Sequence, residues 1–164
     1  MNETPDFNLS FEPLIFQNTE ILILGSLPGR KSIELNQYYG HPRNRIWSIL
    51  SHLKEKETPI NYDDKKAFLN SFKIGLWDVA HSAIRKGSLD SNIKDEKPNN
   101  IYSLTKNNPS IKVIGFNGKK SEQMFYKFFK LNPALKYVSL PSSSPANMAI
   151  NFENICKKWS QLFL

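Results

Sequence analysis

The 164-residue sequence contains a single cysteine, Cys156, so an internal disulfide cannot form. One thiol also excludes a structural zinc knot and an iron–sulfur cluster held by cysteines. No apolar run approaches the roughly 18 residues that a membrane helix requires. The first eleven residues lack the basic and apolar regions of a secretion signal. We therefore expect a cytoplasmic protein with one domain over residues 1–164 and no membrane attachment.

Sequence motifs for metals and common cofactors are also missing. The three histidines, His41, His52 and His81, do not have the spacing of metal ligands. Residues 115–121 look like a phosphate-binding P-loop at first sight, but their glycine spacing is wrong, and no Gly-x-Gly-x-x-Gly follows an expected strand. We expect neither a metal nor a cofactor.

Basic residues outnumber acidic ones, with 22 Lys and Arg against 15 Asp and Glu, for a net charge of +7. A basic surface attracts polyanions, and nucleic acid is the first candidate, although a lysine-rich composition accounts for part of the excess. Only four residues are arginine, and three of them, Arg30, Arg43 and Arg45, fall within residues 30–45. Their clustering favours forked contacts to phosphate or carboxylate groups.

Apolar periodicity predicts alternating strands and helices. Continuous apolar runs predict strands at 21–25, 74–79, 111–116 and 136–140, and residues 1–19 are expected to be an irregular lead-in. Helical spacing and start signals predict helices at 44–55, 63–69, 98–106, 119–130 and 149–162. This alternation is typical of an α/β sandwich with a parallel sheet.

Ligands of such sheets bind beyond the carboxyl ends of the strands, so four segments are candidate site segments. Gly25 and Ser26 follow the first strand, and the tyrosines at 38 and 39 offer flat faces for a base. Asp78 ends the second strand and Asn117 follows the third. The segment 141–147 after the fourth strand is dense in hydroxyl groups, which suit phosphate oxygens.

Six short blocks in these segments together resemble one family. They are Ile-Leu-Gly-Ser-Leu-Pro-Gly (23–29), Gln-Tyr-Tyr-Gly-His-Pro-Arg-Asn (37–44), Gly-Leu-Trp-Asp-Val (75–79), Gly-Ser-Leu-Asp-Ser-Asn-Ile (87–93), Phe-Asn-Gly (116–118) and Leu-Pro-Ser-Ser-Ser-Pro-Ala-Asn (140–147). In this order they resemble the hypoxanthine-DNA glycosylase branch of the uracil-DNA glycosylase superfamily. The resemblance implies a three-layer α/β/α sandwich with a central four-stranded parallel sheet, base excision without a metal, and Asn44 as the catalytic residue.

Two positions depart from the better-known uracil enzymes. Leu27 stands where their first loop has an acidic residue or an asparagine, and Leu140 stands where their last loop begins with histidine. The usual groups for orienting water and assisting the leaving base are therefore absent from these positions. This shifts the catalytic work to Asn44 and favours hypoxanthine over uracil as the main substrate.

The chemistry of deamination suggests how a pocket would recognise its base. Hypoxanthine presents an N–H donor at N1 beside a carbonyl acceptor at O6, the reverse of adenine. We expect Asp78 or a backbone carbonyl to face N1 and the Asn117 amide to face O6, with Tyr39 rather than Tyr38 stacking on the flipped base. Gly25 and Ser26 complete this base-binding pocket, and the residues expected to grip DNA are Arg30, Arg43, Ser142, Ser143, Ser144 and Asn147.

These assignments predict a monomeric, monofunctional DNA glycosylase for base excision repair, which flips the nucleotide and leaves an abasic site. The alternatives are a uracil-preferring glycosylase of the same superfamily and a non-catalytic nucleic-acid-binding domain. At residue level, the alternative for Asn44 is a helix N-cap, because it directly precedes an expected helix.

Overall fold

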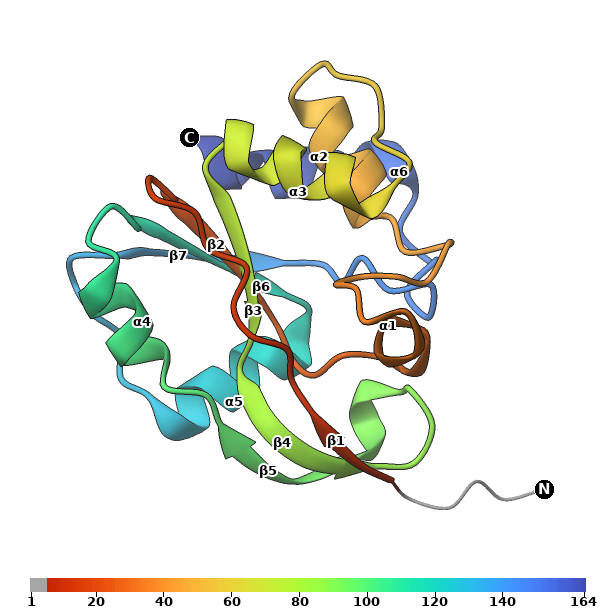
Figure 1. Ribbon diagram of the computed structural model, residues 1–164, viewed down its shortest axis with the longest axis vertical. Coiled ribbons are helices and arrows are strands. Elements are labelled where there is room, and N and C mark those ends of the chain that lie inside the picture. Colours follow the sequence, from red (N-terminus) through yellow and green to blue (C-terminus); the bar gives the residue numbers. More distant parts are fainter. Residues whose placement is uncertain (1–5) are drawn as a thin grey trace.

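Four parallel strands form the central sheet of the computed structural model, which describes residues 6–164. They are β2 (Ile21–Gly25), β3 (Ile74–Asp78), β6 (Val113–Asn117) and β7 (Lys136–Leu140), in the order β3-β2-β6-β7. Figure 1 shows that all four run in the same direction. The expected four-stranded parallel sheet is confirmed.

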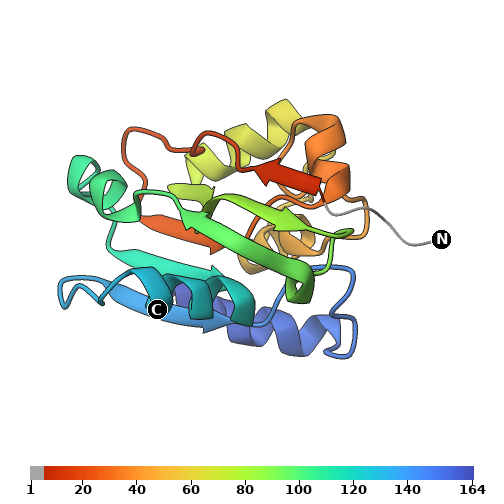
Figure 2. The ribbon, with the colours of Figure 1, turned by 90° about the horizontal axis from the view of Figure 1, so that it is seen from below.

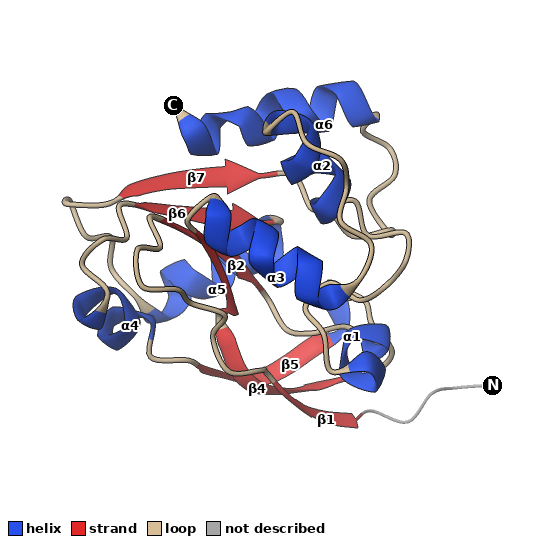
Figure 3. Ribbon diagram, turned by 45° about the horizontal axis from the view of Figure 1, so that its top comes forward, coloured by secondary structure: helices blue, strands red, loops and turns tan. Residues whose placement is uncertain are grey.

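Three helices cover one face of this sheet: α2 (Ile46–Leu53), α3 (Tyr62–Ser71) and α6 (Phe152–Trp159). They lie together on one side of the strands in Figure 3. Their apolar faces share a core with alternate residues of the strands, such as Ile23 and Leu76, both of which are fully buried. The short 3-10 helix Ser160–Phe163 extends this layer at the C-terminus.

The opposite face carries a mixed layer. Two helices, α4 (Ile101–Asn107) and α5 (Lys119–Phe128), pack there beside a small antiparallel sheet, as Figure 2 shows from below. This second sheet has the order β1-β4-β5 and consists of β1 (Asp6–Leu9), β4 (Ala80–Arg85) and β5 (Ile93–Pro98). The three-layer sandwich is therefore present, with strands as well as helices in its third layer.

The small sheet corrects the expectation of an irregular lead-in. Strand β1 pairs with β4 in the register Asp6↔Arg85, and residues 1–5 lie outside the described part of the chain. Only Val79 separates β3 from β4, a strand that the sequence did not predict. Pairing between segments more than 70 residues apart leaves no local signal, and β5 is a mostly exposed, charged strand without an apolar run.

Helix α1 (Arg30–Leu35) was also not predicted, since it has six residues and buries only Ser32. The other expected strands and helices are present, with ends displaced by up to three residues, as in α4 and α6. Within the described residues, the helices are all too short or too polar to cross a membrane.

The packing between the central sheet and α5 can be tested at Phe116. Its side chain is fully buried, with ring centroids 5.2 Å from Phe125 and 6.0 Å from Tyr137. Phe116→Ala leaves a cavity and should lower the free energy of unfolding by about 3–5 kcal/mol. Urea denaturation measures this loss. The matched variant Phe7→Ala, at a side chain that is 67% exposed, should cost under about 1 kcal/mol, and equal losses in both variants would contradict this packing.

Candidate active site

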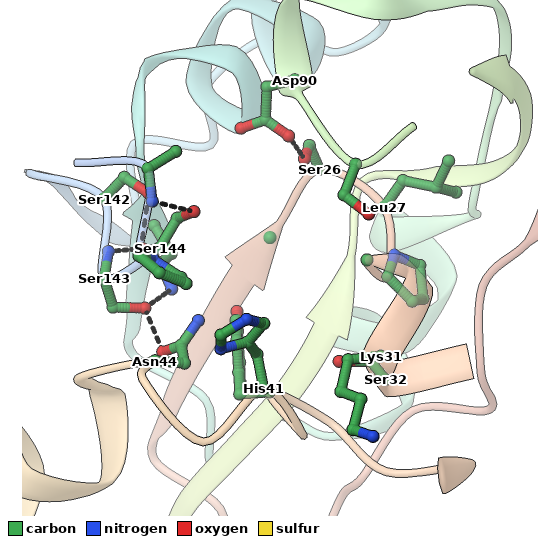
Figure 4. Close-up of a pocket in the computed structure, with 18 of the residues that line it drawn as sticks. Ser26, Leu27, Lys31, Ser32, His41, Asn44, Asp90, Ser142, Ser143 and Ser144 are labelled. Atoms are coloured by element: carbon green, nitrogen blue, oxygen red, sulfur yellow. Dashed lines mark hydrogen bonds between the residues drawn. The ribbon is translucent and has the colours of Figure 1, made fainter. Parts of the chain in front are cut away.

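A cavity of about 380 Å³ opens at the carboxyl ends of the parallel strands, and all four segments expected from the sequence line it (Figure 4). The strand register explains the convergence, because Gly25 of β2 pairs with Asp78 of β3, and Asn117 of β6 pairs with Leu140 of β7. The residues that follow these strands therefore lie at the same edge of the sheet. Of the residues expected at the site, the lining includes Gly25, Ser26, Arg30, Tyr39, Asn44, Asp78, Asn117, Ser142, Ser143, Ser144 and Asn147.

The cavity floor is shaped by the missing side chain of Gly25. A Cβ atom built on this residue would lie 2.6 Å from Asp78 Oδ1 and 3.0 Å from the Tyr39 hydroxyl oxygen. Any side chain here would displace both groups. Glycine thus lets a carboxyl and a phenol approach the end of strand β2 side by side.

Asp78 is an almost fully buried carboxyl at this floor. Its pKa is raised to about 7, chiefly by burial and also by nearby Asp90, while Arg85 partly offsets the rise. Its Oδ2 atom has no hydrogen-bond partner among the described residues. An unpaired buried oxygen is costly to maintain, so this atom is available to a ligand that brings its own donor.

Tyr38 and Tyr39 both line the cavity, and Tyr39 places its hydroxyl at the floor beside Gly25. Its backbone has φ 51°, in the left-handed region that is unusual for tyrosine, and its carbonyl oxygen accepts a hydrogen bond from Trp47 Nε1 at 3.2 Å. The buried Tyr39 hydroxyl has no partner among the described residues, and burial raises its pKa. Tyr38 is 5% exposed and donates its hydroxyl to the carbonyl oxygen of Glu12 at 2.7 Å, so it is a core residue.

A chain of side-chain hydrogen bonds connects three of the expected residues. Asn117 Nδ2 donates to Ser143 Oγ at 2.9 Å, and Ser143 Oγ lies 2.8 Å from Asn44 Oδ1. The backbone nitrogen of Ser143 also donates to Asn117 Oδ1 at 2.9 Å. The loop after β7 is thereby attached to the end of β6 and to the segment before α2.

Asn44 is not the helix N-cap that was the alternative for it, because Arg45 occupies the N-cap position of α2. The Asn44 Oδ1 atom instead accepts a hydrogen bond from the backbone nitrogen of Ile46, two residues on, at 3.0 Å, which is an Asx-turn contact. The Asn44 amide nitrogen points into the cavity in Figure 4. The Asn44 oxygen is therefore held by protein donors, and its nitrogen faces the open space.

Ser143 differs in position from the neighbouring hydroxyls with which it was grouped. It is fully buried, and its Oγ is used by the two asparagines, so its hydroxyl lies behind the cavity wall and away from any approaching phosphate. Ser142 and Ser144 are partly exposed at the cavity. Asn147 donates its Nδ2 to the Ser142 carbonyl oxygen at 2.9 Å, which shapes this loop.

The four arginines divide into two pairs. Arg30 and Arg43 are exposed, as a phosphate contact requires. Arg45 instead forks onto two carbonyl oxygens, those of Ile150 at 2.9 Å and Asn147 at 2.8 Å, and so fastens the loop after β7. The expectation that the clustered arginines bind phosphate or carboxylate is therefore wrong for Arg45.

Arg85 is the second inward-facing arginine, and it belongs to a network that sequence reasoning did not place in the site. It is 2% exposed, donates to the carbonyl oxygen of Pro28, and lies 3.8 Å from Asp90. Asp90 in turn accepts a hydrogen bond from Ser26 Oγ at 2.7 Å. Two features of the sequence could have indicated this network. Arg85 stands apart from the arginine cluster, and the 87–93 block contains one acidic residue, Asp90.

Comparison with known proteins agrees with this geometry. Residues 13–163 match the sequence model described as the uracil DNA glycosylase superfamily. The chain belongs to the uracil-DNA glycosylase superfamily. The match covers almost the whole chain and confirms the resemblance carried by the six sequence blocks.

Two relatives of this superfamily member point to one branch. A protein named hypoxanthine DNA glycosylase from Methanosarcina barkeri is 50% identical over 112 residues, which cover 68% of this chain and 71% of the relative. A second protein of that name, from Methanosarcina acetivorans, is 38% identical over 154 residues, or 93% and 96% of the two chains. The solution NMR structure of a candidate uracil DNA glycosylase from M. acetivorans has a TM-score of 0.79 and 34% identity, covering 97% of this chain and all of that one.

The two departures from the better-known uracil-DNA glycosylases have a structural meaning. Leu27 and Leu140 are 6% and 4% exposed and belong to the two hydrophobic cores on opposite faces of the sheet. Neither side chain offers a polar atom to the cavity. Polar groups of this superfamily member's cavity come instead from Asn44, Asp78 and Asn117.

Other candidate chemistry at the cavity is limited. Lys31 lies at the cavity wall, but its ammonium group is 3.7 Å from Glu34 and is directed toward that surface carboxylate. Among residues 6–164, His, Cys, Asp and Glu side chains do not gather in a group of three that could hold a metal ion.

Asp78→Asn tests the cost of the buried carboxyl. Because folding raises the pKa of Asp78 from 3.8 to about 7, its contribution to stability is complete below about pH 4 and is lost as the pH rises through about 7. The variant, which cannot ionise, should therefore gain up to about 4 kcal/mol relative to the wild type across this range. Urea denaturation at several pH values measures the difference.

The matched control is Asp63→Asn on α3, where the carboxyl is 93% exposed and carries no burial penalty. This control should show no comparable gain with pH. A wild-type curve parallel to that of Asp78→Asn from acid to neutral pH would contradict the assigned burial of an ionisable Asp78.

Proposed function

We propose that this protein is a monofunctional DNA glycosylase that releases deaminated bases, hypoxanthine first, from flipped-out nucleotides and leaves an abasic site. The observation that carries the proposal is a cavity with an unpaired Asp78 oxygen at its floor and the Asn44 and Asn117 amides in its wall. The names of the two Methanosarcina relatives support hypoxanthine as the base. The enzyme acts on DNA as a monomer in base excision repair.

Base selection follows from the donor pattern of the cavity. Hypoxanthine presents N1–H beside O6, whereas adenine presents a lone pair beside an amino group. The Asp78 carboxylate accepts from N1–H, and the remaining N–H of Asn117 Nδ2 donates to O6. Adenine would place a lone pair against the carboxylate and an amino group against the amide, leaving buried polar groups unpaired. Tyr39 supplies the aromatic ring beside the base.

Bond cleavage in this site relies on position and electrostatics. The bond between C1′ and N9 breaks, its electron pair goes to the purine, and an oxocarbenium-like sugar forms. Water then adds to C1′ as a hydroxyl group, and the remaining proton of that water goes to the departing base. The Asn44 amide presents its nitrogen to the cavity, so it contributes as a fixed hydrogen-bond donor to the departing base, on which the electron pair collects. Arg30 and Arg43, with Ser142, Ser144 and Asn147, grip the flanking backbone.

A duplex oligonucleotide with one deoxyinosine tests the function. Wild-type protein should release hypoxanthine and leave an alkali-labile site, and Asn44→Ala should lower the single-turnover rate at least about 100-fold. Scission after alkali measures both, and a second oligonucleotide with deoxyuridine ranks the two bases. An intact deoxyinosine strand at excess enzyme would overturn the proposal.

Asn61→Ala is the matched control for this variant. Asn61 caps α3 by accepting from the Asp64 backbone nitrogen at 2.8 Å, so its loss removes a helix cap outside the cavity. It should reduce stability by about 1 kcal/mol without changing the rate. Equal rate losses in both variants would show that Asn44 acts only through the stability of the fold.

The acidity of Asp78 predicts a pH dependence. The ionised carboxylate is a stronger acceptor for N1–H than the neutral carboxyl, and the pKa of Asp78 is about 7. The value of kcat/KM for deoxyinosine should therefore rise about tenfold from about pH 6 to about pH 8, because the ionised fraction increases by that factor. Asp78→Asn should have a low and flat profile over this range. A variant profile with the wild-type slope would exclude Asp78 as the titrating group.

A further inference from the structure

Ser143 holds the site together through a hydroxyl that no solvent reaches. Its side chain is fully buried, and its three polar backbone and side-chain groups all have partners. The hydroxyl lies between Asn117 Nδ2 and Asn44 Oδ1, at 2.9 Å and 2.8 Å. Its backbone nitrogen donates to Asn117 Oδ1 at 2.9 Å, and its carbonyl oxygen accepts from the Arg45 backbone nitrogen at 3.1 Å.

The direction of these bonds follows from the number of protons available. An amide nitrogen can only donate, so Ser143 Oγ accepts from Asn117 and must point its single proton at Asn44. Asn44 Oδ1 also accepts from the Ile46 backbone nitrogen at 3.0 Å, and both of its lone pairs are then engaged. If the Asn44 amide were rotated by 180°, its NH2 group would face the Ile46 backbone N–H and the Ser143 hydroxyl, both of which are donors.

We propose that Ser143 is a positioning residue: its hydroxyl holds the Asn44 amide with the nitrogen toward the substrate and links this catalytic group to the base-reading amide of Asn117. The inference rests on the proposed function and extends it. In this arrangement, the Asn44 atom that faces the substrate is the amide nitrogen, which is a hydrogen-bond donor.

The link also gives base recognition a route to catalysis. A base that accepts from Asn117 Nδ2 stabilises the amide orientation in which Nδ2 also donates to Ser143. A base that offers a donor at that position opposes it, and Ser143 then loses the partner that directs its proton to Asn44. Hydrogen bonds in such chains strengthen one another in a buried setting.

Single-turnover kinetics on the deoxyinosine duplex test the role of the hydroxyl. Ser143→Ala should lower the rate of base release about 10- to 100-fold while changing the dissociation constant for DNA less than about threefold. Ser143→Thr keeps the hydroxyl and should recover most of the lost rate. A rate for Ser143→Ala within about twofold of the wild type, or a Thr variant as slow as the Ala variant, would overturn the proposal.

Ser51→Ala is the matched control. Ser51 is also a buried serine, 1% exposed, and it donates its hydroxyl to the Trp47 carbonyl oxygen at 2.7 Å on α2, outside the cavity. Thermal unfolding should show similar stability losses for the two Ala variants, with the rate loss confined to Ser143→Ala. An equal rate loss in Ser51→Ala would assign the effect to general destabilisation.

Two further variants address the coupling to Asn44. In an Asn44→Ala background, Ser143→Ala should add less than about threefold to the loss, because the group that Ser143 positions is gone. Asn44→Asp keeps the shape but turns an oxygen to the cavity, so it should be as slow as Asn44→Ala. Additive losses in the double variant, or a fast Asn44→Asp enzyme, would overturn the inference.

Failure of the inference and failure of the proposed function give different results. Wild-type protein that leaves the deoxyinosine strand intact contradicts the glycosylase function itself. Wild-type protein that releases hypoxanthine, with Ser143→Ala equally active, contradicts only the role of Ser143.

Discussion

The hydrogen-bond chain from Asn117 through Ser143 to Asn44 is the interaction on which the site depends. It joins the end of β6, the loop after β7 and the segment before α2, which are distant in sequence. Arg45 reinforces the same junction by forking onto two carbonyl oxygens of that loop. The Asn44 oxygen accepts from Ser143 Oγ and from the Ile46 backbone nitrogen, and the Asn44 amide nitrogen faces the cavity as a result.

A second constraint is the buried charge at the cavity floor. Asp78 sits against Gly25 with an unpaired oxygen, and burial keeps its pKa far above that of a solvated aspartate. The Ser26–Asp90–Arg85 network lies beside it and holds the loop after β2 through the Pro28 carbonyl oxygen. The unpaired Asp78 oxygen therefore lowers the stability of the fold, at a position where a ligand can supply the missing hydrogen-bond donor.

Much of this arrangement was predictable because the relevant signals are local. The four core strands are short apolar runs, and the rule that parallel strands present their ligands at their carboxyl ends placed Asp78 and Asn117 at one edge. The small sheet was missed because β1 and β4 pair across more than 70 residues, and Arg45 was misassigned because its carbonyl partners belong to another loop. Arg85 and Asp90 were missed for the same reason, since their partners are not neighbours in sequence.

By itself, the sequence determined the α/β class, the family and the identity of the polar residues at the strand ends, since periodicity and short ordered blocks are written along the chain. Which atom of each residue is available to a ligand follows from the three-dimensional packing. It assigned the Asn44 oxygen to protein donors and its nitrogen to the cavity, buried Ser143, and left Asp78 unpaired. Hydrogen-bond direction and burial depend on which distant groups become neighbours, and spacing along the chain does not encode either.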